Sequence, residues 1–326
     1  MLKKGFIYII SLAFLALSGT VLFLYLFYPS AGNTPGIEVE STERQIERGR
    51  YLANHVAVCI DCHSDRNWSK FSGPIVDGTL GKGGELFDEK MGLPGTIYSK
   101  NITPYNLSNW TDGELYHIIT TGVNKDGEPI FPLMPYRQYR HMDPDDIKAI
   151  IAYIRTLKPI ENETPETTIN FPVNLIMRTF PKPADPVNRP PASDTVAYGK
   201  YMTTISACTG CHTPENKGFK IEELYMAGGF EFQMPGGTIR SSNITPHMKT
   251  GIGSWSEQEF IDRFKRYDVP TDSLPSSSEQ GFNTVMPWKM YAGMETDDLK
   301  AIFAYLKTIE PVENNVQRFS PAEQEN

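Results

Sequence analysis

The chain repeats its own sequence once, and this duplication constrains its fold more than any other feature. Five short blocks recur in the same order in both halves, at offsets between 142 and 152 residues. The matched blocks are 48–52 with 198–202, 99–104 with 241–246, 110–114 with 255–259, 134–136 with 286–288, and 146–153 with 298–305. Five matches in one order predict two copies of a single folding module.

The boundaries of the two copies follow from length and proline spacing. A chain of 326 residues is long enough for two domains. Residues 159–191 hold eight prolines, which disfavour helices and favour an extended connector. Within it, the apolar stretch 173–180 predicts a short helix or turn packed between the modules. The predicted division is an anchor at 1–30, domain one at 42–160, a Pro-rich linker at 161–192, domain two at 193–313 and a polar, loosely ordered tail at 314–326.

Both modules are expected to be helical, so the predicted fold class is all-α, with two tandem domains after one N-terminal helix. Thr111 and Ser256 are good N-caps, each followed three residues later by a glutamate that completes a capping box. Gly49 and Gly199 predict a close crossing of the first and last helix of each module. The last helices carry apolar residues at helical spacing, namely Ile147, Ile150, Ile151 and Ile154, and Leu299, Ile302, Phe303 and Leu306. The Gly-rich stretches 83–87 and 228–232 predict long loops with a short hairpin.

The N-terminus carries an apolar run without charge, from Gly5 to Tyr28. At about 1.5 Å per residue, this run is long enough to cross a bilayer as a helix. Lys3 and Lys4 precede it, and the next basic residue is Arg44. The positive-inside tendency therefore predicts a single-pass anchor in the inner membrane with the rest of the chain on the periplasmic side. The alternative is a cleaved signal peptide, whose apolar core is normally shorter, about 7–15 residues.

All four cysteines lie in two copies of one motif, Cys-x-x-Cys-His. On a helix, residues at i, i+3 and i+4 share one face. Two thiols can then form thioethers with the vinyl groups of a haem while the imidazole binds its iron, so the motif predicts two covalently bound c-type haems. The residues are Cys59, Cys62 and His63, and Cys208, Cys211 and His212.

Two other readings of the cysteines are weaker. A thioredoxin-like dithiol would need one Cys-x-x-Cys in a βαβ setting. A zinc site built from the four cysteines would leave both histidines unexplained.

The sixth iron ligands are predicted to be Met134 and Met286. Methionine is the usual partner of histidine in electron-transfer haems and raises their potential. The two methionines are matched between the copies, and each precedes a proline. The predicted metal ligands are therefore His63 with Met134, and His212 with Met286. His141 is the main rival for the ligand in the first module.

Other matched residues carry smaller expectations. Met142 and Met294 are expected to fill the core, and Tyr139 and Tyr291 either line the haem pocket or fill the core. The Asn-Ile-Thr sequences at 101–103 and 243–245 match glycosylation sequons. Because they recur with a following proline, they are better explained as structural turns. The remaining histidines, His55, His117 and His247, are expected to be ordinary polar residues.

Both modules resemble class I cytochrome c domains, with Cys-x-x-Cys-His early, Met-Pro late and a terminal helix containing Ala-Tyr. The blocks Gly-Gly-x-x-Phe, Asn-Ile-Thr-Pro, 251–256 and Met-Pro-Trp resemble the membrane-anchored multihaem cytochrome c subunits of bacterial alcohol, gluconate and aldehyde dehydrogenase complexes. The resemblance covers residues 44–313. It implies transfer of electrons from a dehydrogenase subunit to quinone, an oxidase or a soluble cytochrome, with no substrate site in this chain. Those subunits commonly hold three such domains, and this chain holds two.

Three functions can be compared on these residues. A dihaem electron carrier fits the paired methionines, which close both irons. A dihaem enzyme, such as a peroxidase or a thiosulfate dehydrogenase, needs an open sixth position. A haem-based gas sensor would need a signalling domain, and none follows. The net charge of −8 argues against binding to nucleic acid.

Overall fold

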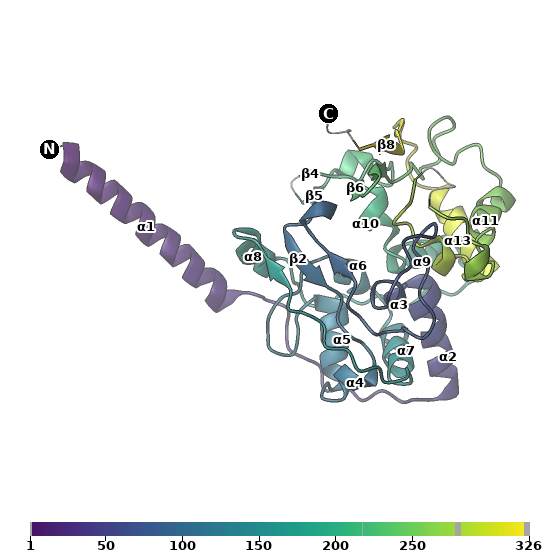
Figure 1. Cartoon of the computed structure of the whole chain (residues 1–326), viewed down its shortest axis with the longest axis horizontal. Coiled ribbons are helices and arrows are strands. Elements are labelled where there is room, and N and C mark those ends of the chain that lie inside the picture. Colours follow the sequence, from purple (N-terminus) through teal and green to yellow (C-terminus); the bar gives the residue numbers. More distant parts are fainter. Residues whose placement is uncertain (1, 217, 278–281, 323–326) are drawn as a thin grey trace.

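A long N-terminal helix leaves the body of the molecule and stands alone (Figure 1). The structure is a computed structural model that describes residues 2–216, 218–277 and 282–322. Helix α1 (Leu2–Phe27) is apolar, and Phe14 and Leu15 are about two-thirds exposed. The single N-terminal apolar helix expected from the sequence is therefore present. Its length and composition suit a membrane span, and a signal sequence would share them.

The first half of the body begins with the helices that carry the first cysteine motif. Its elements are α2 (Glu43–Tyr51), the π-helical turn η1 (Leu52–Val56), α3 (Cys59–Cys62), β1 (Leu86–Phe87), η2 (Glu89–Met91), β2 (Gly95–Tyr98), α4 (Pro104–Leu107), α5 (Asp112–Thr121), α6 (Tyr136–Tyr139) and α7 (Pro144–Ile154). The connector adds β3 (Thr168–Ile169), α8 (Val173–Ile176) and η3 (Met177–Thr179).

The second half keeps the order of the main helices and of the central hairpin, with an extra hairpin, β4–β5, after its cysteine motif. Its elements are α9 (Thr195–Ile205), α10 (Cys208–His212), β4 (Glu215–Asn216), β5 (Phe219–Lys220), η4 (Glu222–Leu224), β6 (Glu231–Met234), β7 (Gly237–Arg240), α11 (Glu257–Lys265), η5 (Thr271–Ser273), α12 (Trp288–Tyr291), α13 (Thr296–Leu306) and β8 (Phe319–Pro321).

The first and last helices of each half cross closely, as predicted. Helix α2 packs on α7, and α9 packs on α13. A Cβ on Gly49 would lie 1.8 Å from the carbonyl oxygen of Ala149, and one on Gly199 would lie 1.8 Å from that of Ala301. Only glycine fits at these two crossings. Both predicted capping boxes are also present, at the starts of α5 and α11.

The expectation of an all-α fold needs correction, because the body also contains short antiparallel strands. The predicted hairpins form as β1–β2 and β6–β7. Each gains a third strand from the chain that follows the last helix: β3 pairs with β2, and β8 pairs with β7. The described part of the tail is thus ordered, although its polar sequence predicts loose order. Backbone pairing stabilises these strands without requiring an apolar pattern.

The segment 173–180 forms the predicted short helix, but its location differs from the prediction. Its buried Arg178 pairs with Glu128 of the first half and donates to the carbonyl oxygen of Tyr28 at 2.8 Å. The Arg178 guanidinium also lies 4.7 Å from the ring centre of Tyr25. The segment therefore joins the end of α1 to the first half, as α8 does in Figure 1, rather than packing between the halves.

The two halves meet through a reciprocal pair of hydrogen bonds. The Tyr51 hydroxyl of the first half donates to Asp298 of the second at 2.5 Å. The Tyr201 hydroxyl of the second half donates to Asp146 of the first at 2.6 Å. Tyr51 and Tyr201 are matched between the copies, as are the two aspartates. The contact therefore has approximate twofold symmetry.

Candidate haem-binding sites

Each Cys-x-x-Cys-His sequence forms a single helical turn after a residue with positive φ. Val58 precedes α3 with φ 47°, and Ala207 precedes α10 with φ 52°. The left-handed region is unfavourable for a β-branched residue such as valine. The same conformation at both matched positions marks a local geometry that the surrounding structure imposes.

The two histidines of the motif are oriented in the same way. His63 Nδ1 lies 2.6 Å from the carbonyl oxygen of Lys100, and His212 Nδ1 lies 2.7 Å from that of Ser242. A carbonyl only accepts hydrogen bonds, so the Nδ1 atoms carry the proton and the Nε2 atoms keep a free lone pair. Desolvation lowers the pKa of both imidazoles, which keeps them neutral. A neutral imidazole held through Nδ1 is the form that binds metals.

The cysteine thiols lie in surroundings that do not favour thiolate. Burial raises the pKa of the Cys59, Cys62 and Cys208 thiols to about 12. A redox-active dithiol would have a lowered pKa instead. Among the described residues, no group of three or more His, Cys, Asp or Glu side chains could hold a metal ion. The donor set thus fits thioether attachment better than a dithiol or a zinc site.

The Asn-Ile-Thr segments form the turns directly after Lys100 and Ser242, whose carbonyl oxygens accept from the two histidines. Asn101 Oδ1 accepts from the backbone N–H and the hydroxyl of Thr103 at 2.9 and 2.8 Å, and Asn243 does the same with Thr245 at 2.9 and 2.7 Å. Asn101 Nδ2 donates to the carbonyl oxygen of Ile160. Both asparagines are buried and bonded. This supports the structural turn over the glycosylation sequon.

Two further asparagines support the backbone at the histidines, and this role was not predicted from the sequence. Asn162 Nδ2 donates to the carbonyl oxygens of Lys82 and Gly83, at 2.9 and 3.3 Å. Gly83 N–H in turn donates to the carbonyl oxygen of His63. Asn314 makes the same two bonds, to Ala227 and Gly228. The signal was a sixth matched block, Pro-Ile-Glu-Asn at 159–162 and Pro-Val-Glu-Asn at 311–314.

Met134 and Met286 lie half-buried on the loops directly before α6 and α12. Five residues after each methionine, a buried tyrosine ties the loop to the cysteine motif of the same half. The Tyr139 hydroxyl donates to the Ala57 carbonyl at 2.7 Å, and that of Tyr291 donates to the Ser206 carbonyl at 2.8 Å. Both acceptors stand two residues before the first cysteine.

The competing residues occupy other places. Met142 and Met294 are buried in the core, which confirms their predicted packing role. His141 Nδ1 lies 3.0 Å from the carbonyl oxygen of Asp185 in the connector. That contact engages one of its two ring nitrogens away from the motif.

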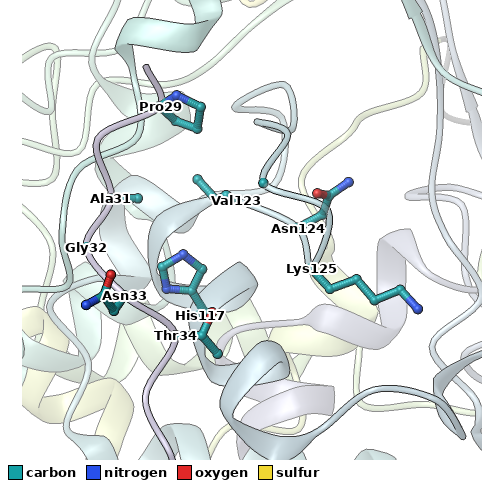
Figure 2. A pocket seen from close by; sticks show the side chains of 10 residues that line it. Pro29, Ala31, Gly32, Asn33, Thr34, His117, Val123, Asn124 and Lys125 are labelled. Atoms are coloured by element: carbon teal, nitrogen blue, oxygen red, sulfur yellow. The ribbon is translucent and has the colours of Figure 1, made fainter. Parts of the chain in front are cut away.

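A separate cavity of about 280 Å³ lies where the chain leaves α1 (Figure 2). Ala31 and Val123 line it, with Lys125 at its edge and the buried His117 pointing into it. Desolvation lowers the pKa of His117. No residue of either Cys-x-x-Cys-His motif lines this cavity, so it is distinct from the candidate haem sites.

Comparison with known proteins gives relatives that extend over most of the chain. No family model matches. The chain is 31% identical over 281 residues to the fructose dehydrogenase cytochrome subunit of Gluconobacter japonicus, covering 81% of this chain and 52% of that protein. It is 28% identical over 285 residues to the alcohol dehydrogenase (quinone) cytochrome c subunit of Gluconacetobacter polyoxogenes, covering 82% and 56%. The chain therefore spans about half the length of these relatives.

A shorter relative matches over most of its own length. The diheme cytochrome c-type protein of Cereibacter sphaeroides is 24% identical over 265 residues, which cover 78% of this chain and 83% of that protein. All three relatives are named as cytochromes or cytochrome subunits, which agrees with the resemblance of the sequence motifs.

Proposed function

We propose that the chain, a homologue of cytochrome c subunits of dehydrogenase complexes, is a dihaem electron carrier. The observation that carries the proposal is the duplication of one site geometry. In each half, a Cys-x-x-Cys-His turn holds a histidine through Nδ1 and leaves Nε2 free. Two such sites, each with a matched methionine proposed as sixth ligand, favour a relay of single electrons over a dihaem enzyme, which needs an open sixth position.

The ligands of the two proposed haems are assigned as follows. Cys59 and Cys62 would form the thioethers in the first site, with Cys208 and Cys211 in the second. The axial ligands would be His63 with Met134, and His212 with Met286. The bound iron would supply reversible one-electron oxidation and reduction. We assign the two halves to tandem class I cytochrome c domains, at 42–160 and 193–313.

The protein surroundings would lower the cost of this redox change. The backbone carbonyls of Lys100 and Ser242 hold the imidazoles before any electron arrives, and the Asn101 and Asn243 turns fix those carbonyls. The hydrogen bonds from Tyr139 and Tyr291 fix the methionine loops against the chain just before the Cys-x-x-Cys-His turns. Little reorganisation of the chain is then needed.

The location and partners extend the proposal. Helix α1 would anchor the chain in the inner membrane, with both haem sites on the periplasmic side. A dehydrogenase subunit would donate electrons, because the relatives are named as cytochrome subunits of fructose, alcohol and gluconate dehydrogenases. Quinone, an oxidase or a soluble cytochrome would accept them.

Haem stoichiometry tests the proposal. The chain matured in a host that attaches haem c should carry two haems, measured by the pyridine haemochrome spectrum and by intact mass. Replacing Cys59 and Cys62 by alanine should remove one haem, and replacing Cys208 and Cys211 should remove the other. A colourless product, or a mass equal to that of the bare chain, would refute the assignment.

The methionine assignment has its own test. Ferric haem c with a methionine ligand shows a weak far-red absorption band, and both haems should contribute to it. Met134→Ala and Met286→Ala should each lower one reduction potential and leave both haems attached. Two unchanged potentials would contradict the axial ligands, and a high-spin spectrum with peroxide turnover would favour the enzyme alternative.

A further inference from the structure

A loop of the first half packs against residues 267–274 and 282–288 of the second half, which include Met286. This loop, residues 67–73, follows the first cysteine motif. Its buried Phe71 stacks on Tyr267 at 5.7 Å between ring centres and meets the edge of Phe282 at 6.2 Å. Lys70 Nζ donates to the carbonyl oxygens of Asp272 and Leu274 at 3.1 Å each. The contact is therefore apolar at its centre and hydrogen-bonded around it.

Ser72 of this loop bonds directly to the backbone around Met286. Its Oγ donates to the Met286 carbonyl at 2.5 Å and accepts from the Trp288 N–H at 2.9 Å. One hydroxyl thus bridges the two peptide groups on either side of Pro287. Ser72 is 2% exposed, so water does not compete for these bonds.

Asn283 fixes the position of Ser72. Its Oδ1 accepts from the Ser72 N–H at 2.8 Å, and its Nδ2 donates to the carbonyl oxygens of Trp68 and Lys70. Ser72 also adopts φ 70°, a left-handed conformation that these bonds hold in place. The serine is therefore a defined part of the contact.

Among the hydrogen bonds of the described residues, no side chain of the second half bonds to the backbone of Met134 or Tyr136. The bonds at Met134 and Tyr136 come from the first half's own backbone, such as Tyr136 N–H to the Met134 carbonyl at 2.8 Å. The equivalent bond, from Trp288 to Met286, is also present in the second half. Ser72 is an addition to that shared turn, and it comes from the other half.

We propose that Ser72 is a positioning residue for the sixth ligand of the second haem. By holding the 286–288 backbone, it keeps the Met286 side chain at the iron and makes ligation in the second half depend on the first. The inference rests on the proposed function, in which Met286 binds iron.

The test uses the full, haem-loaded chain and added imidazole, which competes with methionine for ferric haem. In Ser72→Ala, the part of the far-red band that belongs to the second haem should disappear at about fivefold to tenfold lower imidazole concentration, because two hydrogen bonds are lost. The part from the first haem should not shift. Ser69→Ala is the matched control, since its exposed hydroxyl donates to Asn67 in the same loop.

Further variants separate the possible failures. Met286→Ala should remove the same part of the band entirely. If it does not, Met286 is not the ligand and the proposed function is wrong at this site. If Met286→Ala removes it while Ser72→Ala leaves the imidazole titration unchanged, only the positioning role is refuted. Asn283→Ala should shift the titration in the same direction, and it replaces Ser72→Ala if that variant matures poorly.

Discussion

Gly49 and Gly199 show at the residue scale how tightly the duplicated fold is packed. Each lies where a side chain would overlap the carbonyl of the crossing helix, at 1.8 Å. Gly49→Ala or Gly199→Ala should therefore lower the free energy of unfolding by roughly 3 kcal/mol, the upper range for overpacking. Urea unfolding of the haem-loaded protein measures this. Gly36→Ala is the control, because a Cβ there would have nothing within 4 Å, and equal losses in control and test variants would contradict the packing argument.

Residues were predictable where the duplication marked them. The cysteines, histidines, glycines and Asn-Ile-Thr turns recur in both copies, so each position is supported twice. Ser72 and Asn283 could not be found in this way, because their contact joins segments more than 200 residues apart and has no matched copy among the described hydrogen bonds. The sequence holds no local pattern for a hydrogen bond formed only when the two halves meet.

At the scale of single elements, the capping box of α5 gives a prediction with a defined pH dependence. Thr111 Oγ1 accepts from Glu114 N–H, and the Glu114 carboxylate accepts from Thr111 N–H. Thr111→Ala should lower the free energy of unfolding by about 1 kcal/mol. The exposed Ser108→Ala is the control.

Low pH should weaken the capping box of α5. The hydrogen bonds from Thr111 lower the pKa of Glu114. A lowered folded-state pKa adds stability that is present above the ordinary glutamate pKa, about 4.3, and is lost as pH falls through the folded value. Glu114→Gln should therefore be less stable than the wild type at neutral pH. The difference in free energy of unfolding between the two proteins should become smaller at low pH. Urea unfolding at neutral pH and at pH values below about 4.3 measures this difference. A difference that grows as the pH falls would contradict a stabilising role for the Glu114 carboxylate.

Helices were easier to predict than strands. Caps and apolar periodicity are local signals: Thr111 is the N-cap of α5, and the apolar residues from Ile147 to Ile154 lie within α7. Strands β3 and β8 exist only because they pair with hairpin residues 72–84 positions earlier. They are only two and three residues long, so the linker and tail carry no alternating pattern that predicts them.

At the scale of the whole molecule, the reciprocal tyrosine bonds decide how firmly the halves are joined. The two buried aspartates, Asp146 and Asp298, differ in the groups that donate hydrogen bonds to them. Asp146 also pairs with Arg48 and Arg189, whereas the hydrogen bonds described at the Asp298 side chain come from two tyrosine hydroxyls, Tyr51 and Tyr198. Removing a donor from a buried carboxylate costs more when fewer donors remain.

Tyr51→Phe should therefore destabilise the protein more than its matched counterpart Tyr201→Phe. We expect a loss of about 2–3 kcal/mol for the first and about 1 kcal/mol for the second, from urea unfolding of the haem-loaded chain. Tyr105→Phe, at an exposed tyrosine, should change little. Because Tyr51 joins the halves, its loss should also increase the radius of gyration in small-angle scattering before the main unfolding transition. Equal losses for the two variants would mean that the arginines at Asp146 do not compensate for the missing hydroxyl.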